Sequence, residues 1–336
     1  MKRRRVLRLA CAFLALSVLS PSPAGAEPVS MAVEARRIDN FCVGSGQTRF
    51  GPFEFAGGLS LSAGAAAFGS FSAIRFRDAG DRFIGVADTG YWYSGRIVRG
   101  EAGRPAGVAD FAMEPMLGRD GAPLDGKRDS DAESLALKGD RLTVGFERAH
   151  RIVEYRLAGD RPGPAERNVD FLIPRNELRT NRGFETVAYA PEVGPLRGAR
   201  IAVAERSLDR QGNVFGAVLE GPRKGIFTVV RSDDFDITDG AFLPDGDLIL
   251  LERRFNMLSG ISMRLRRIAA DDIRPNARLD GDVLFSAGMA CQIDNMEGLD
   301  IWRRDDGAVM LSLVSDDNGS FLQRTLYLEF RLAGER

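Results

Sequence analysis

The sequence predicts an all-β fold, a β-propeller of five four-stranded blades, formed as a single domain over residues 27–336. Three observations support this prediction. Apolar residues alternate with polar ones in short runs, one hairpin pattern recurs five times, and the centre of each hairpin falls on residues that favour turns.

Strands are expected in short runs bounded by Gly, Asp and Pro. In Arg141–Phe146 and Asp247–Leu251, β-branched, aromatic or leucine side chains recur at every second position, which is the period of a strand. No run of helical period and helical length is evident in the chain. The pattern therefore excludes an all-α fold and favours an all-β one.

The repeat consists of an inner strand, a turn, and a second strand that ends in an acidic residue. The equivalent positions of the inner strand lie 61, 52, 53 and 59 residues apart, and they are Ser72, Glu133, Glu185, Thr238 and Glu297. The acids that end the second strand are Asp88, Glu147, Glu205, Glu252 and Asp316. A repeat of this length is typical of propeller blades.

The register of each hairpin follows from symmetry, because two residues of an antiparallel pair face each other when the turn lies midway between them. The midpoint of Glu133 and Glu147 lies in Lys138–Asp140, and the midpoint of Thr238 and Glu252 lies in Pro244–Gly246. The other three midpoints also fall on turn residues. We therefore expect the two members of each pair to face each other at one end of the propeller.

The last repeat has only about 40 residues before the C-terminus, so its outer strand must come from elsewhere. The segment Phe53–Leu61 is the natural candidate, and this closure would bring Cys42 near Cys291 for a disulfide. Two separate buried thiols are the alternative to that disulfide. A sixth blade built from residues 30–70 is the alternative to five blades.

Residues 1–26 are predicted to be a signal peptide. Five basic residues precede an apolar run over 9–20, and the run is followed by a small-residue cleavage site ending at Ala26. Export by the general or the twin-arginine route is left open. Cleavage removes the five basic residues and takes the formal net charge from −1 to −6, which disfavours a nucleic-acid partner. We expect a monomer in the periplasm or outside the cell, with no membrane contact after cleavage.

Several segments together resemble the bacterial phytase-like family, described as having the esterase-like activity of phytase. They are 68–73, Asp131–Ala136, 181–185, Ile237–Gly246, Leu251–Phe255 and Asp294–Leu299. The resemblance covers about 50–335 and implies a secreted or periplasmic propeller that hydrolyses phosphoesters or esters. The family offers no agreed catalytic residue to carry over.

Acidic residues from all five repeats should converge beside the central channel. They are Asp88, Glu133, Glu147, Glu185, Glu205, Asp239, Glu252, Glu297 and Asp316. Carboxylates at such density repel one another unless cations compensate. Oxygen ligands without imidazole favour Ca²⁺ or Mg²⁺, and a single histidine excludes zinc and iron sites that need two. The alternative is neutralisation by arginines alone.

Three arginines directly follow acids of the repeat: Arg148, Arg206 and Arg253. With a metal bound, they are predicted to bind a small anionic substrate, since a guanidinium grips phosphate through two parallel hydrogen bonds. His150 is the candidate general acid or base. The sequence thus favours a metal-dependent phosphoester or ester hydrolase; the alternatives are a gluconolactonase-type lactonase and a non-catalytic binding or scaffold propeller.

Overall fold

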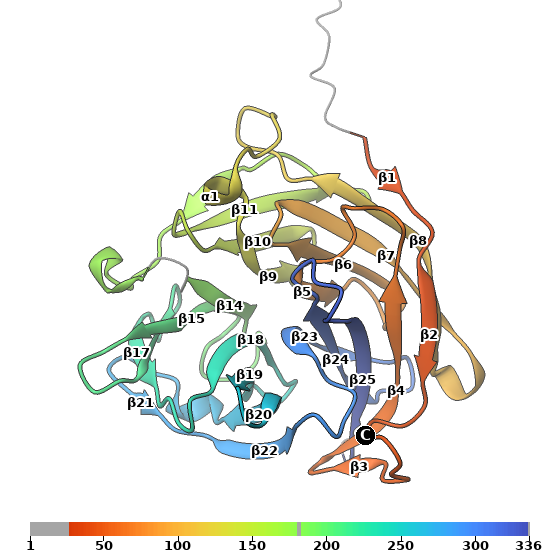
Figure 1. The fold of residues 1–336 in the computed structure, drawn as a ribbon. Helices are drawn as coiled ribbons and strands as arrows, with labels where there is room; N and C mark the ends of the chain where they lie inside the picture. The colour runs from red at the N-terminus through yellow and green to blue at the C-terminus, as the bar shows by residue number, and fades with distance from the viewer. Residues whose placement is uncertain (1–26, 180–182, 335–336) are drawn as a thin grey trace, which may run out of the picture.

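In the computed structural model, which describes residues 27–179 and 183–334, five small β-sheets form a closed ring (Figure 1). All named strands pair antiparallel except β17 and β21, which pair parallel. The prediction of a five-bladed propeller is confirmed. The predicted signal peptide lies outside the described residues, and no described helix is long and apolar enough to cross a membrane.

The blades follow one another along the chain, each beginning with its innermost strand. Blade 1 consists of β5 (Phe71–Phe76), β6 (Arg82–Ala87), β7 (Tyr91–Arg99), β8 (Pro105–Pro115) and β1 (Val29–Ser30). Blade 2 consists of β9 (Ala132–Lys138), β10 (Arg141–Phe146), β11 (Arg151–Ala158), β12 (Arg161–Pro162) and β13 (Arg167–Val169). Blade 3 consists of β14 (Phe184–Tyr189), β15 (Arg200–Leu208), β16 (Val214–Val218), β17 (Gly225–Val229) and β21 (Arg278–Leu279).

Blade 4 consists of β18 (Asp236–Phe242), β19 (Leu248–Asn256), β20 (Gly260–Ile268) and β22 (Asp282–Ala287). Blade 5 consists of β23 (Asn295–Arg303), β24 (Val309–Asp316), β25 (Thr325–Leu332), β4 (Phe53–Ser62), β2 (Glu34–Ile38) and β3 (Arg49–Phe50). Four short helical segments lie in the connections: η1 (Glu101–Gly103), α1 (Lys127–Ser130), η2 (Arg175–Glu177) and η3 (Ala270–Asp272).

The outer edges are less regular than four strands per blade. Blade 2 has three long strands, and both of its short strands pair with β11. Blade 3 gains β21 from a segment that follows the third strand of blade 4 in the chain. Edge strands are free to vary because the inner strands of each blade already bury their faces against the neighbouring blades.

Five apolar clusters hold the ring together, one between each pair of adjacent blades. Between blades 1 and 2, for example, the Trp92 and Tyr155 rings meet edge to face with their centroids 5.2 Å apart, beside buried Leu135 and Val144. The alternation of side chains across each strand supplies both faces of a blade with apolar groups. Packing between blades thus fixes the ring whose axis carries the candidate site.

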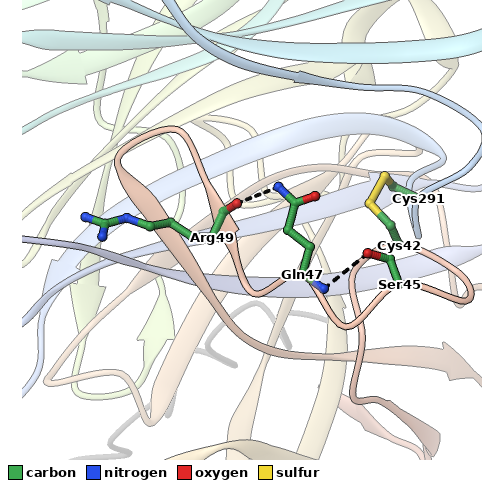
Figure 2. The surroundings of a disulfide bond; sticks show 5 residues. All are labelled: Cys42, Ser45, Gln47, Arg49 and Cys291. Atoms are coloured by element: carbon green, nitrogen blue, oxygen red, sulfur yellow. Dashed lines mark hydrogen bonds between the residues drawn. A yellow bond between two sulfur atoms is a disulfide. The ribbon is translucent and has the colours of Figure 1, made fainter.

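The N-terminal segment closes the ring. Strand β4 pairs antiparallel with β25, with Leu59 opposite Tyr327, so residues far apart in sequence complete blade 5. A disulfide joins Cys42 to Cys291 with an S–S distance of 2.03 Å (Figure 2). The predicted closure and disulfide are confirmed. The alternative of a sixth blade from residues 30–70 is wrong, because this segment supplies the outer strands of blade 5.

Candidate functional site

Each inner strand contains a β-bulge at the same position of the repeat. In blade 2, Ser134 faces Gly145 while Ala132 faces Phe146, so Glu133 has no partner on β10. The same shift leaves one residue of the inner strand unpaired in the other blades. The five bulge residues are Ser72, Glu133, Glu185, Thr238 and Glu297. A bulge re-aims its side chain, and three of these five positions carry a glutamate.

The bulges correct the predicted register. Glu147 was expected to face Glu133, but its backbone N–H donates to the Asp131 carbonyl at 2.9 Å. Likewise, Asp316 faces Asn295 instead of Glu297. The symmetry argument assumed an unbroken ladder, and one extra residue in the inner strand displaces every partner beyond it.

A pocket of about 290 Å³ opens at the end of the propeller where the inner strands begin. Eight acidic residues line it: Asp88, Asp131, Glu133, Glu147, Glu185, Glu205, Glu297 and Asp316. The other lining residues are Ser72, Lys127, Arg148, Arg253 and Asn318. Seven of the nine predicted acids and two of the three predicted arginines are therefore brought together at one place.

Burial and mutual repulsion raise the pKa values of several of these carboxyl groups. Burial, with Asp131 and Glu147 nearby, raises the pKa of Glu133 well above its usual range. Burial and neighbouring carboxylates act in the same direction on Glu185. The pKa of Glu147 rises to about 7, chiefly through burial and then through Asp131. Among the described lining residues, eight acids thus face three basic residues, and this crowding together with burial disfavours ionisation of all eight at neutral pH.

Two further acids of the pocket with raised pKa values belong to blade 5. Burial raises the pKa of Glu297 to about 8, although Arg253 opposes the shift. Burial also raises the pKa of Asp316 to about 7. Both shifts favour the protonated form of these carboxyl groups near neutral pH.

Three basic side chains partly compensate the acids. Lys127 Nζ lies 2.6 Å from a carboxylate oxygen of Asp88 and 2.6 Å from one of Asp131. Arg148 Nε donates to Asp131 at 2.8 Å, and Arg253 Nη2 lies 3.2 Å from Glu297 Oε1. Most of these contacts are on the blade 1 and blade 2 side, while Arg253 also lies 3.9 Å from Glu205 of blade 3.

Two groups of carboxylates in the pocket could each hold a metal ion. In one group, oxygens of Asp88, Asp131 and Glu133 lie within 4.8 Å of one another, and in the other, so do oxygens of Glu147, Glu185 and Glu205. Asp88 Oδ1 is buried and has no hydrogen-bond partner among the described residues. Hard oxygen donors without imidazole or thiolate fit Ca²⁺ or Mg²⁺ better than zinc.

Two predicted metal ligands lie elsewhere. Asp239 is fully buried deeper in the channel, where both of its oxygens accept from Arg75, at 3.0 and 3.1 Å. Glu252 is held between Arg264 and Arg266. The bulge at Thr238 turns Asp239 away from the pocket, and Thr238 itself donates to the Met296 carbonyl at 2.9 Å.

The Arg75–Asp239 pair also joins blades across the axis. Arg75 donates to the Leu299 carbonyl at 2.8 Å, and Asp239 accepts from the Leu299 N–H at 2.8 Å, so blades 1, 4 and 5 meet here. Both residues follow the bulges of their inner strands and therefore lie below the pocket. The pair forms the floor of the site.

Two further predicted residues are also outside the pocket. Arg206 Nε lies 3.2 Å from Asp236 at a neighbouring position of blade 4, so its guanidinium is engaged there. His150 does not line the pocket, and burial lowers its pKa. The structure therefore does not bring these two residues into the pocket, because a position close after an acid of the repeat does not ensure that a side chain turns to the axis.

Four lining residues were not predicted: Ser72, Lys127, Asp131 and Asn318. Asp131 lies just before β9 and is missed because the register argument placed Glu133 opposite Glu147. Lys127 lies in α1, in the connection between blades 1 and 2, which carries no repeat signal. Ser72 occupies the same bulge position as the three glutamates, and this equivalence was the available signal.

A comparison with protein families confirms the family resemblance. The family model described as "Phytase-like: Esterase-like activity of phytase" matches residues 66–319. A search of curated proteins found no match to the sequence.

Two solved structures are similar at low identity. An aldose sugar dehydrogenase from Streptomyces coelicolor, in its PQQ-bound form, is 12% identical with a TM-score of 0.43; the match covers 81% of this chain and 98% of that one. Glutaminyl cyclase from Myxococcus xanthus is 11% identical with a TM-score of 0.40; the match covers 79% of this chain and 92% of that one.

Proposed function

The chain belongs to the phytase-like family, and from that premise and the acidic pocket we propose that it is a hydrolase that uses Ca²⁺ or Mg²⁺ to cleave a phosphoester or ester bond of a small anionic substrate. The observation that carries the proposal is the excess of eight acids over three basic residues among the described residues that line one pocket. That excess calls for cations, and an anionic substrate can enter only when cations are bound.

The residues suited to hold the cations are the two carboxylate groups around Glu133 and around Glu185. A bound divalent cation supplies two kinds of chemistry, polarisation of a substrate oxygen and a lowered pKa of bound water. The buried, raised-pKa carboxyl groups give up their protons when such a cation binds, so metal affinity increases with pH in this range.

Three side chains would bind and orient the substrate. Arg148, Arg253 and Lys127 present cationic donors into the pocket between the acids, and an arginine can hold two oxygens of one phosphate. The Arg75–Asp239 floor closes the channel below them. The reacting group is thereby kept at one end of the propeller.

Glu297 is the residue best suited to move a proton. Its pKa of about 8 leaves it protonated at neutral pH, and Asn295 Nδ2 donates to its Oε1 at 2.8 Å, which fixes the carboxyl group. A protonated carboxyl group can donate to the leaving-group oxygen as the bond breaks. His150 has no part in this arrangement, since it lies outside the pocket.

The proposal also includes the location and state of the protein. A disulfide in the described fold is compatible with an oxidising compartment, so we place the mature protein in the periplasm or outside the cell as a monomer. The acidic pocket is unsuited to nucleic acid as a partner.

The test is turnover of p-nitrophenyl phosphate and p-nitrophenyl acetate by the purified mature protein with Ca²⁺, with Mg²⁺ and with chelator. We expect turnover that chelator abolishes and Ca²⁺ or Mg²⁺ restores, and that Glu133→Gln removes. Glu192→Gln is the matched control, since Glu192 is 70% exposed in the loop at the opposite end. Metal binding without turnover of either compound class would instead indicate a non-catalytic binding propeller.

A further inference from the structure

The large apolar side chains that remain exposed are concentrated beside the pocket, in three loops. The hairpin β19–β20 exposes Phe255, Met257 and Leu258, at 69%, 93% and 99%. The loop before β23 exposes Met289 at 64%, and the loop β24–β25 exposes Phe321 and Leu322 at 95% and 78%. The other described large apolar residues of comparable exposure are four valines, and none lies in a pocket-end loop of blades 1–3.

These three loops are contiguous. Gly260 of the hairpin packs so closely on Met289 that a Cβ at Gly260 would lie 2.7 Å from Met289 Cγ. On the other side, the backbone N–H of Arg324 donates to Asp294 at 3.1 Å, and Arg324 Nη1 donates to Gln292 at 2.7 Å. The loops therefore form one apolar rim on the blade 4 and blade 5 side of the pocket.

The rim is also continuous with the pocket itself. Arg253, which lines the pocket, stands on β19 two residues before Phe255. Asn318, which also lines the pocket, lies in the same loop as Phe321. The hairpin continues for three residues beyond Arg253, so its tip lies roughly 10 Å above the pocket wall.

From this arrangement we propose that the rim binds the apolar chain of an amphiphilic substrate whose anionic head enters the acidic pocket. This inference rests on the proposed function, and it narrows the substrate class to alkyl or acyl esters of an anionic head group. A pocket of about 290 Å³ is at the small end of ligand sites, so it can take only a head group, and the rest of the substrate must extend over its rim.

Other occupants fit less well. A second copy of the chain seated on the rim would cover the mouth of the pocket, to which the rim is joined. A bilayer surface with anionic lipids would be repelled by the eight described acidic residues of the adjoining pocket and by the net negative charge of the mature chain. Clusters of exposed apolar side chains on a soluble protein mark binding sites, and here the adjoining site is the pocket.

The test is calorimetric titration with methyl-, butyl- and octylphosphonic acid in the presence of Ca²⁺, below the concentration at which the octyl compound aggregates. Phosphonates keep the anionic head but are not hydrolysed as esters, so binding is measured whether or not the protein is an enzyme. Full burial of one methylene raises affinity about fourfold, so we expect octylphosphonate to bind at least about tenfold more tightly than butylphosphonate.

The variant Met257→Ser/Leu258→Ser/Phe321→Ser should reduce the octyl-to-butyl affinity ratio to near one. Val193→Ser, at an 84% exposed valine in the loop at the other end, should keep the ratio of the unaltered protein. Equal affinities for all three phosphonates in the unaltered protein would overturn the inference. The inference would also be overturned if the unaltered protein formed a dimer that the triple substitution disrupts. It would be overturned as well if the protein co-sedimented with phosphatidylcholine vesicles but showed no effect of phosphonate chain length.

Turnover separates this inference from the proposed function. If the phosphonates show the chain-length effect while the protein hydrolyses neither octyl phosphate nor p-nitrophenyl acetate, the rim inference stands and the hydrolase proposal fails. If methyl and octyl phosphate are hydrolysed with equal kcat/KM and the phosphonates bind equally, the hydrolase proposal stands and the rim inference fails.

Discussion

The buried Arg75–Asp239 pair allows a stability prediction that also separates it from the metal ligands. Asp239→Asn keeps the shape of the side chain but only one of the two oxygens that accept from the N–H groups of Leu299 and Gly240, at 2.8 and 2.7 Å. It removes the carboxylate that is hydrogen-bonded to the buried Arg75 guanidinium and leaves Asp300 as the other carboxyl group that interacts with it. Removing one partner of a buried ion pair typically costs about 3–5 kcal/mol, because the other charge remains desolvated.

A double-mutant cycle then removes the charge of Arg75 as well. Arg75→Met alone should also lower the free energy of unfolding, since Asp239 and the Leu299 carbonyl both lose the guanidinium that donates to them. Arg75→Met/Asp239→Asn should recover part of the loss, because no uncompensated charge remains and methionine fills similar space. The coupling free energy measured from the cycle should be about 2 kcal/mol or more.

The assay is urea unfolding of the four proteins, each with and without Ca²⁺. We expect the stabilisation by Ca²⁺ to be the same in Asp239→Asn as in the unaltered protein, because Asp239 lies below the pocket and is bound to Arg75. An Asp239→Asn protein of unaltered stability that no longer responds to Ca²⁺ would refute this reasoning and return Asp239 to the set of metal ligands.

Three further predictions concern the pocket and the closure. Between about pH 5 and 8 in chelator, the free energy of unfolding should fall as pH rises. In the folded state the pKa values of Glu147 and Asp316 are raised to about 7 and that of Glu297 to about 8, so the folded state binds more protons than the unfolded chain. A urea midpoint that rises over this pH range would contradict the prediction. Glu297→Gln should keep near-normal stability at pH 7, where the carboxyl group is already mostly protonated, yet lose turnover; unaltered kcat would remove Glu297 as the proton donor. Cys42→Ser/Cys291→Ser should lower the free energy of unfolding by about 2–4 kcal/mol in denaturant titrations. If the denaturant midpoint were the same for this variant, the reduced native protein and the oxidised native protein, the disulfide would not support the closure.

The sequence predicts the blades well because the signal is local. The turns of all five inner hairpins lie within one residue of their predicted centres, as the pairs Phe76–Phe83 and Phe242–Leu248 illustrate. The closure by Phe53–Ser62 is also predictable, because the last repeat lacks an outer strand and a cysteine lies on each side of the junction.

The site is predicted less completely because it depends on contacts that no short pattern carries. A single bulge residue in each inner strand shifts the register and turns Asp239 from the pocket towards Arg75, 164 residues away in the chain. Lys127 enters from a connecting segment outside the repeat. Charge alone shows that acids gather at the axis, but which arginine neutralises which acid is decided by the packing of blades.

The central claim is that divalent cations compensate the acids of the pocket, and calcium titration of the chelator-treated protein tests it most directly. Titration at pH 6.5 in two buffers of different ionisation enthalpy measures the affinity and the protons released. We predict saturable binding with net proton release, weakened by Glu133→Gln or Glu185→Gln and unaffected by Glu192→Gln. At about 100 times its Kd, Ca²⁺ should stabilise the fold by about 2.7 kcal/mol. The absence of both binding heat and proton release with Ca²⁺ and with Mg²⁺, in a protein whose melting temperature chelator leaves unchanged, would contradict the account and favour neutralisation by arginines and protons alone.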